Sequence, residues 1–338
     1  MPAVRIALDA MGGDNAPATA VHGGVLAAGP ELTVVLVGDP AAIEAELAAH
    51  RELPGAAHVE IVPASERVTS NEDGARAVRA KPDSSVAVAC RLVKDGQADA
   101  AVSMGNTGAM MAASTLLMRR APGVLRPAIA TVLPCRKGFM VLLDAGANHE
   151  AKPEHLRQFA LMGRLLAQTV LRVPEPSVGL LSIGEEDERG SELVQAAHQL
   201  LKGTPGFVGN VEGRDIPRGT VDVVVTDGFT GNVALKLYES SAEFILTELR
   251  DAATSSLPAK LGGLLLRPAV RRMRTRLDPN LYGGAMLLGV RGPAVIGHGS
   301  GNEVAVQHAV EVAARAVRED TIGRISQELE RPEAAAPA

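Results

Sequence analysis

Short runs of valine, isoleucine and leucine alternate with alanine-rich stretches along nearly all of the 338 residues. Several runs are apolar throughout, which is typical of parallel strands that helices cover on both faces. We expect strands at Val4–Leu8, Val34–Val37, Val59–Val62, Ala98–Ser103, Ala128–Leu133, Met140–Leu143, Val178–Ile183, Val221–Thr226 and Ala294–Ile296. The alternation predicts a three-layer α/β/α fold, with helices on both faces of a mainly parallel sheet.

The stretches between the strands have the apolar spacing of amphipathic helices, as in Pro153–Leu171 and Glu303–Glu319. No linker rich in proline or serine divides the chain, so we expect one large domain over residues 1–330 and a disordered tail over 331–338. From Phe229 to Leu277 the pattern is helical without a strand, with breaks expected near Ser255–Pro258 and at Pro268. This segment predicts a helical protrusion over about residues 240–280.

Composition excludes several classes of protein. Aromatic residues make up 2% of the chain and the formal net charge is -5, which argues against nucleic-acid binding. Cys90 and Cys135 stand far apart, so they form neither a disulfide scaffold nor a tetrathiolate zinc site. No apolar run approaches the ~20 residues that span a bilayer, and the N-terminus enters a strand without a signal peptide. We therefore expect a cytoplasmic protein with at most peripheral membrane contact.

Polar, glycine-bearing turns follow six of the predicted strands. Because ligands bind beyond the carboxyl ends of parallel strands, we expect these turns to meet at one sheet edge. Their backbone N–H groups and the adjoining helix N-termini favour anions. For any single turn, helix capping is an equally good interpretation. The turns are Asp9–Pro17, Ser103–Ala109, Asp144–Asn148, Gly184–Glu186, Asp227–Asn232 and Gly297–Ser300.

The usual motifs of nucleotide, hydrolase and metal chemistry are missing. The sequence has no GxGxxG after the first strand, no GxxxxGK[ST], no GxSxG and no HExxH. Most histidines are scattered without the spacing of metal ligands, and a surface or capping role explains them. His298 is different because glycines flank it after a strand. We expect no metal site and no cofactor.

These turns resemble the motifs of the PlsX-type phosphate acyltransferases, in order, from about residue 4 to about residue 320. The matching segments are Ala7–Asp14, Ser103–Ala109, Leu143–Asn148, Gly209–Gly213, Asp227–Val233, Tyr282–Ala285 and His298–Gly299. Met104 stands where a smaller residue is expected, and Arg189 where lysine is usual. Both departures concern substrate preference rather than the reaction.

The resemblance implies a fold similar to phosphotransacetylases and isopropylmalate dehydrogenases. It implies transfer of a long-chain fatty acyl group from acyl-acyl carrier protein to inorganic phosphate, giving acyl phosphate for phosphatidic acid and phospholipid biosynthesis. It also implies a homodimer with peripheral membrane contact. One alternative is a phosphotransacetylase-like enzyme that uses acyl-CoA. A second is a dehydrogenase, but we cannot place the metal-binding carboxylates and the nucleotide loop that it would need. A third is a lipid-surface adaptor, which would need no anion site.

This chemistry needs no catalytic triad, because phosphate is already anionic and a thiolate leaves readily. The protein must position two partners and stabilise an oxyanion. We expect Asn106, Lys236 and His298 to be catalytic, although Asn106 is equally suited to cap a helix. Contacts to phosphate or substrate are expected from Gly12, Gly13, Asp14, Asn15, Lys81, Ser103, Gly105, Thr107, Gly108, Asn148, Asn210 and Asn232.

Charged residues near these turns have plainer interpretations as well. Lys81 and Lys236 are equally well explained as solvated surface lysines. Asp9, Asp144 and Asp227 would repel phosphate if ionised and unpaired, so we expect them to cap helices or orient donors.

Leu261–Leu277 combines five arginines with seven large apolar residues and has no acidic side chain. Such a segment suits anionic lipid or an acidic carrier protein. A helix at a dimer interface is the alternative. We expect the surface for membrane or carrier protein to comprise Leu264, Leu265, Leu266, Arg267, Arg271 and Arg272.

Overall fold

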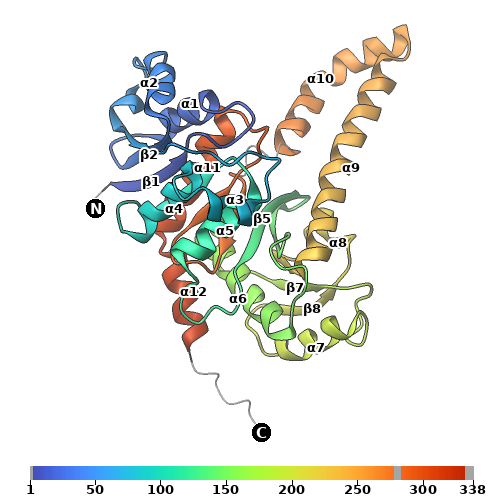
Figure 1. Ribbon diagram of the computed structural model, residues 1–338. Helices are drawn as coiled ribbons and strands as arrows, with labels where there is room; N and C mark the ends of the chain where they lie inside the picture. The colour runs from blue at the N-terminus through green and yellow to red at the C-terminus, as the bar shows by residue number, and fades with distance from the viewer. Residues whose placement is uncertain (1–2, 278–282, 332–338) are drawn as a thin grey trace.

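An 11-stranded sheet runs through the whole body of the molecule. The computed structural model describes residues 3–277 and 283–331 (Figure 1). The strand order is β3-β2-β1-β4-β11-β10-β5-β6-β9-β7-β8. The strands are β1 (Val4–Asp9), β2 (Leu32–Gly38), β3 (Val59–Pro63), β4 (Ala100–Ser103), β5 (Ala128–Cys135), β6 (Gly138–Leu143), β7 (Val178–Leu181), β8 (Phe207–Val211), β9 (Val223–Val225), β10 (Ala285–Leu288) and β11 (Ala294–Ile296).

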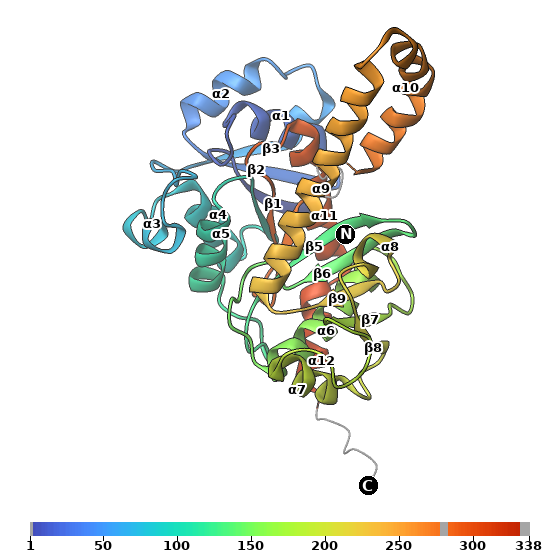
Figure 2. The ribbon, with the colours of Figure 1, turned by 90° about the vertical axis from the view of Figure 1, so that its right-hand side faces the viewer.

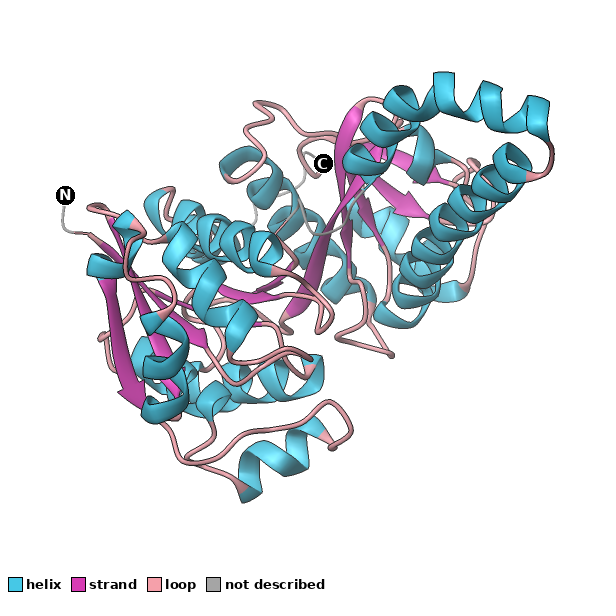
Figure 3. Ribbon diagram, turned by 90° about the horizontal axis from the view of Figure 1, so that it is seen from above, coloured by secondary structure: helices cyan, strands magenta, loops and turns pink. Residues whose placement is uncertain are grey.

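Helices cover both faces of this sheet, so the predicted three-layer α/β fold is confirmed (Figure 3). The helices α1, α6, α11 and α12 pack on one face, and α3, α4 and α5 pack on the other. The α-helices are α1 (Ala18–Ala27), α2 (Pro40–Ala48), α3 (Gly74–Ala80), α4 (Ser85–Lys94), α5 (Thr107–Ala113), α6 (Pro153–Thr169), α7 (Glu192–Leu201), α8 (Asp215–Arg218), α9 (Gly228–Thr254), α10 (Leu257–Leu277), α11 (Glu303–Arg318) and α12 (Thr321–Glu330).

The sheet consists of two parallel parts that run in opposite senses. Strands β3, β2, β1, β4 and β11 are parallel to one another, and so are β6, β9, β7 and β8. Between the parts, the pairs β11–β10, β10–β5 and β5–β6 are all antiparallel. Three reversals leave the second part antiparallel to the first. The prediction that all six glycine turns meet at one sheet edge is therefore wrong.

All nine predicted strands are present, with ends that shift by a few residues. Two strands were missed. The edge strand β8 contains Gly209, which weakens the strand signal. Strand β10 reads Ala-Met-Leu-Leu, residues that favour helices, and its pairing on both sides overrides that preference.

Helices α9 and α10 extend beyond the sheet as an arm of two antiparallel helices (Figure 1). The helical structure is interrupted between Thr254 and Leu257, as expected. The break expected at Pro268 is absent, because α10 continues through this residue. Pro268 is exposed there, so water can bond the carbonyl group that loses its helical partner. No helix in the described part of the chain is long and apolar enough to cross a bilayer.

The expected disordered tail, apart from Arg331, and the first residue of the Tyr282–Ala285 motif lie outside the described residues.

Candidate active site

Three of the predicted turns meet where β1, β4 and β11 end. We call residues 9–15, 103–108 and 297–301 the first turn cluster. The N–H of Asp14 donates to the carbonyl oxygen of Gly299 at 2.8 Å. A Cβ atom on Gly12 would lie 2.9 Å from the amide nitrogen of Gly105. The backbones of the three turns are therefore in close contact, as their parallel strands require.

The buried carboxyl group of Asp9 stabilises this cluster through hydrogen bonds. The Ser103 hydroxyl donates to Asp9 Oδ2 at 2.7 Å, and Ser103 Oγ accepts the N–H of Gly105 at 3.1 Å. Burial raises the pKa of Asp9 above its ordinary value, although the hydrogen bond from Ser103 opposes the shift. The expected orienting role of Asp9 is confirmed, and Ser103, predicted to contact phosphate or substrate, hydrogen-bonds to Asp9 and Gly105 in this structure.

Asn106 has the capping role that the sequence left open as an alternative. Its Oδ1 accepts the N–H of Ala109 at 2.9 Å, and its Nδ2 donates to the carbonyl oxygens of Glu72 at 2.8 Å and Thr69 at 3.2 Å. The side chain thus begins α5 and fastens the loop before α3 to it. The next two residues, Thr107 and Gly108, are exposed in the first turn of α5.

Lys81, predicted to contact phosphate or substrate, is paired with an acidic side chain in this structure. Its Nζ lies 2.6 Å from Glu72 Oε2 and donates to the carbonyl oxygen of Arg67 at 3.0 Å. The hydrogen bond from Lys81 lowers the pKa of Glu72 to about 2. Lys81 therefore stabilises the same loop that Asn106 holds.

Lys236 and His298 come together through a residue that the sequence analysis missed. Lys236 Nζ lies 3.1 Å from Glu239 Oε2, and His298 Nε2 lies 3.4 Å from Glu239 Oε1. The hydrogen bond from His298 is the main cause that lowers the pKa of Glu239. These contacts join α9 to the first turn cluster. The positions of Asn232, Lys236 and Glu239 could have revealed the link, because spacings of four and three residues place them on one side of a helix.

Two of the other predicted polar turns form a second cluster, residues 144–148 and 227–232, where β6 and β9 end. Asp144 is fully buried and accepts the N–H groups of Ile129, Gly146, Ala147 and Asn148, together with the side-chain amide of Asn148, at 2.8–3.1 Å. Asp227 caps α9 through the N–H of Thr230 at 2.9 Å. The predicted capping and orienting roles of Asp144 and Asp227 are confirmed.

The side-chain amide of Asn148 donates its hydrogen bonds to other residues of the protein. Its Nδ2 donates to Asp144 Oδ2 and to the carbonyl oxygen of Pro127, both at 2.8 Å. The N–H of Gly228 donates to the carbonyl oxygen of Asn148 at 2.8 Å, so the two turns of this cluster are joined. Asn232 is exposed beside Gly146 at the start of α9.

Helix α9 connects the two clusters, crossing the molecule toward the arm (Figure 2). At a rise of about 1.5 Å per residue, Glu239 lies ~18 Å along the helix from Asp227. One side of α9 thus carries Asn232, Lys236 and Glu239 from the second cluster to the first.

Asn210 lies far from the first turn cluster. It is on the edge strand β8, six strands from β11 and so about 29 Å across the sheet. Its Oδ1 is 2.9 Å from His198 Nδ1, and its Nδ2 donates to the carbonyl oxygen of Glu186 at 2.8 Å. The structure therefore does not bring Asn210 to the first turn cluster, and β8 is two strands from β9, where the second turn cluster begins. The Gly184–Glu186 turn belongs to this same edge.

Exposure separates the remaining candidates. Gly13 has a φ of 101°, which favours glycine, and lies against Met104 and Gly299. Asp14 and Asn15 are exposed at the rim of the first turn cluster. Met104 is buried beneath Gly297 and Gly301, which leave room for its long side chain. This packing explains how the chain accommodates methionine at that position.

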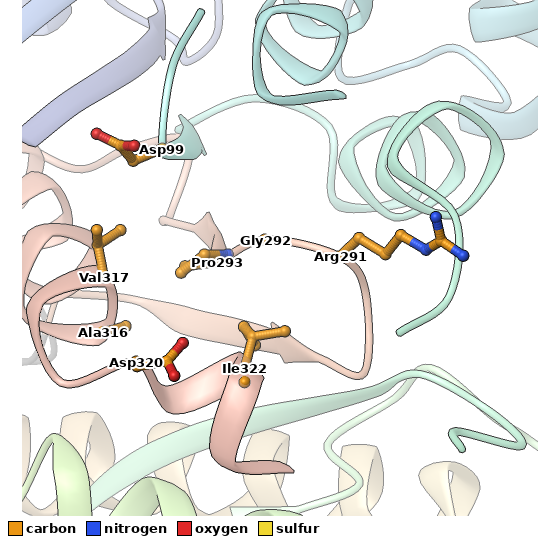
Figure 4. A pocket seen from close by; sticks show the side chains of 9 residues that line it. Asp99, Arg291, Gly292, Pro293, Ala316, Val317, Asp320 and Ile322 are labelled. Atoms are coloured by element: carbon orange, nitrogen blue, oxygen red, sulfur yellow. The ribbon is translucent and has the colours of Figure 1, made fainter. Parts of the chain in front are cut away.

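A separate cavity of about 280 Å³ lies at the opposite ends of β4 and β11 (Figure 4). Asp99 precedes β4, Pro293 precedes β11, and Asp320 comes from the segment between α11 and α12. In Figure 4 the Arg291 side chain extends away from Asp99 and Asp320. Since the first turn cluster lies at the carboxyl ends of these strands, this cavity is no part of it. Among the described residues, no group of histidine, cysteine and carboxylate side chains could hold a metal ion.

A family model described as "Fatty acid synthesis protein" matches residues 4–324. The chain belongs to this family. It is 48% identical over 331 residues to a phosphate acyltransferase of Desulfitobacterium hafniense, covering 97% of this chain and 98% of that protein. It is 47% identical over 329 residues to a phosphate acyltransferase of Thermus thermophilus, covering 96% and 98%. The resemblance to the PlsX-type phosphate acyltransferases is confirmed, and the chain is an acyltransferase.

Solved structures show the fold. EutD phosphotransacetylase from Staphylococcus aureus has a TM-score of 0.60 at 16% identity, covering 93% of this chain and 94% of that one. A phosphotransacetylase from Streptococcus pyogenes has a TM-score of 0.62 at 14% identity, covering 94% of each chain. The expected similarity to the phosphotransacetylase fold is confirmed.

Proposed function

We propose that the protein transfers a long-chain acyl group from acyl-acyl carrier protein to inorganic phosphate, giving acyl phosphate for phospholipid synthesis. The observation that supports this most is the first turn cluster with Lys236 and His298 beside it, in a chain whose relatives are phosphate acyltransferases. Backbone N–H groups of glycine turns, together with the Lys236 ammonium group and the His298 imidazole, suit a phosphate and a developing oxyanion.

The reaction requires the protein to hold a phosphate oxygen close to the thioester carbon. The phosphate oxygen attacks this carbon, the carbonyl oxygen becomes an oxyanion, and the thiolate of the carrier departs as the carbonyl re-forms. Holding both partners in a near-attack geometry can supply about 7–11 kcal/mol of the barrier. In this proposal Gly12, Gly13 and Gly105 line the reacting groups, and Asn106 positions Thr107 and Gly108.

Thiol release from long-chain acyl-acyl carrier protein should require phosphate and should be unchanged by a chelator. The physical reason is that phosphate is the nucleophile and needs neither a metal nor a nucleotide. The measurement is thiol appearance with and without phosphate, beside direct detection of acyl phosphate. Equal release without phosphate would identify a thioesterase and contradict the proposal. Faster turnover of short-chain acyl-CoA would favour the phosphotransacetylase-like alternative.

The arm presents apolar side chains to its surroundings. Leu257, Leu261, Leu264, Leu265 and Leu266 are exposed, with Leu265 at 83%. Arg267, Arg271 and Arg272 follow on α10 and are exposed as well. Leucines that insert among acyl chains and arginines at the level of anionic headgroups are typical of interfacial helices. We propose that the protein is cytoplasmic and associates peripherally with the membrane. The arm makes this contact, near the carrier-bound substrate.

A second apolar surface lies along α9. Phe229, Val233 and Leu237 are spaced by four residues, and Phe244 continues the row, all more than half exposed. The row is on the side of α9 opposite Leu235, which packs into the core. We propose that a second copy of the chain covers this row in a homodimer. The single sheet supports our expectation of one domain over residues 1–330, with the arm projecting from it.

Replacing Leu264, Leu265 and Leu266 with glutamine should release the protein from anionic vesicles, since about 0.8 kcal/mol is lost for each CH₂ group no longer buried. Activity on dissolved substrate should change little. Vesicle flotation measures the release, and sedimentation measures the oligomeric state. Arg271→Glu with Arg272→Glu should raise KM for the carrier substrate if this face binds it. If both variants bind vesicles and substrate normally but become monomers, the segment forms the dimer interface.

A further inference from the structure

Glu239 occupies an unusual place for a carboxylate if Lys236 and His298 bind phosphate. Each of its oxygens pairs with a nitrogen from a different element, Lys236 Nζ of α9 at 3.1 Å and His298 Nε2 of the β11–α11 loop at 3.4 Å. Two oxygens of one phosphate could make the same two contacts. The carboxylate therefore stands where an anionic substrate would have to bind.

Electrostatics excludes both anions from this position at once. A phosphate held by Lys236 and His298 would lie a few ångströms from Glu239, and like charges at that separation repel. The hydrogen bond from His298 lowers the pKa of Glu239, so the carboxylate is charged at neutral pH and burial does not neutralise it. One of the two anions must leave.

The existing pairs are weak enough for phosphate to replace them. Lys236 and His298 are more than half exposed, and exposed ion pairs contribute little in water. Phosphate carries more charge than a carboxylate and has more acceptor oxygens. Glu239 is itself only partly exposed on a helix, and a change of side-chain rotamer is enough to turn it away.

We propose that Glu239 is an internal stand-in for phosphate, which holds Lys236 and His298 together across the first turn cluster and gives way when phosphate binds. Glu239 keeps the Lys236 and His298 side chains in place while the site is empty. Its removal should therefore improve phosphate affinity, whereas removal of a residue that only positions Lys236 and His298 should weaken it. The inference rests on the proposed role of these two residues as phosphate ligands.

The test is the dissociation constant of inorganic phosphate for the full chain, measured by calorimetry at constant ionic strength. Glu239→Gln keeps the size of the side chain and removes its charge, and phosphate should bind roughly 3- to 20-fold more tightly, as expected for two exposed ion pairs. Glu243→Gln, one turn further along α9, removes the same charge from an exposed position and should change the affinity less than twofold.

A double-mutant cycle separates competition from a general charge effect. In the Lys236→Gln background, Glu239→Gln should lose most of its benefit. Weaker or unchanged phosphate binding in Glu239→Gln, or no phosphate binding to either protein, overturns the proposal. Tighter binding without phosphate-dependent thiol release keeps the role of Glu239 but refutes the proposed reaction. Phosphate-dependent thiol release with unchanged phosphate affinity supports the proposed reaction but refutes the role of Glu239.

Discussion

Asp144→Asn should lower the free energy of unfolding by about 3–5 kcal/mol, because an NH₂ group would replace one of two buried oxygen atoms and leave the N–H groups that bond to it without an acceptor. The carboxylate is fully buried and accepts five N–H bonds within 3.1 Å. An asparagine amide would turn its own N–H groups toward some of these donors. Since domains are commonly stable by only 5–15 kcal/mol, the variant should show a clearly lower urea midpoint.

Asp83→Asn is the matched control. Asp83 also accepts two hydrogen bonds, from the N–H and the hydroxyl of Ser65 at 2.9 and 2.5 Å, but this pair is exposed. Because water replaces lost bonds at the surface, its loss should cost about 1 kcal/mol or less. Equal effects of the two substitutions would show that burial of Asp144 contributes nothing. A stable Asp144→Asn protein would contradict the structural role of the second turn cluster.

The strands and the layers could be predicted from sequence, because buried parallel strands are recorded locally as apolar runs. The opposite strand directions of the two parts of the sheet could not be predicted. They depend on the pairing of β10 with β5 and β11, and β10 has the composition of a helix. The placement of the six turns at one edge failed for that reason, since it assumed one direction for every strand.

The candidate site was predictable where a turn and its chemistry share a few consecutive residues. The glycines of the first turn cluster and the capping aspartates are examples, since local geometry requires them. Glu239 was missed because its meaning depends on His298, which is 59 residues away in the chain. Asn106 shows a related limit, because its sequence position fits a cap and an oxyanion donor equally well. The loop it binds, residues 69–72, decides between them.

Gly12→Ala should reduce kcat/KM by about 10²- to 10³-fold, because it forces apart the two turns that would hold phosphate and thioester. A Cβ atom at Gly12 would lie 2.6 Å from Asp9 Oδ2, 2.9 Å from the Gly105 nitrogen and 3.0 Å from Ser103 Oγ. The Gly105 nitrogen is backbone, and the Asp9 and Ser103 side chains are buried and hydrogen-bonded to each other, so neither can move aside freely. The β1–α1 turn must therefore shift by several tenths of an ångström, and positions in the site depend on that distance.

Gly213→Ala is the control, because a Cβ atom there has nothing within 4 Å and the backbone has no positive φ. It should keep both normal kinetics and a normal melting temperature. The effect of Gly12→Ala should appear in kcat/KM for phosphate-dependent thiol release in protein that remains folded, as checked by thermal melts. Full activity of Gly12→Ala would remove the first turn cluster from the reaction. Transfer would then have to take place at the second cluster, about 18 Å away along α9, where Asn232 lies beside Gly146.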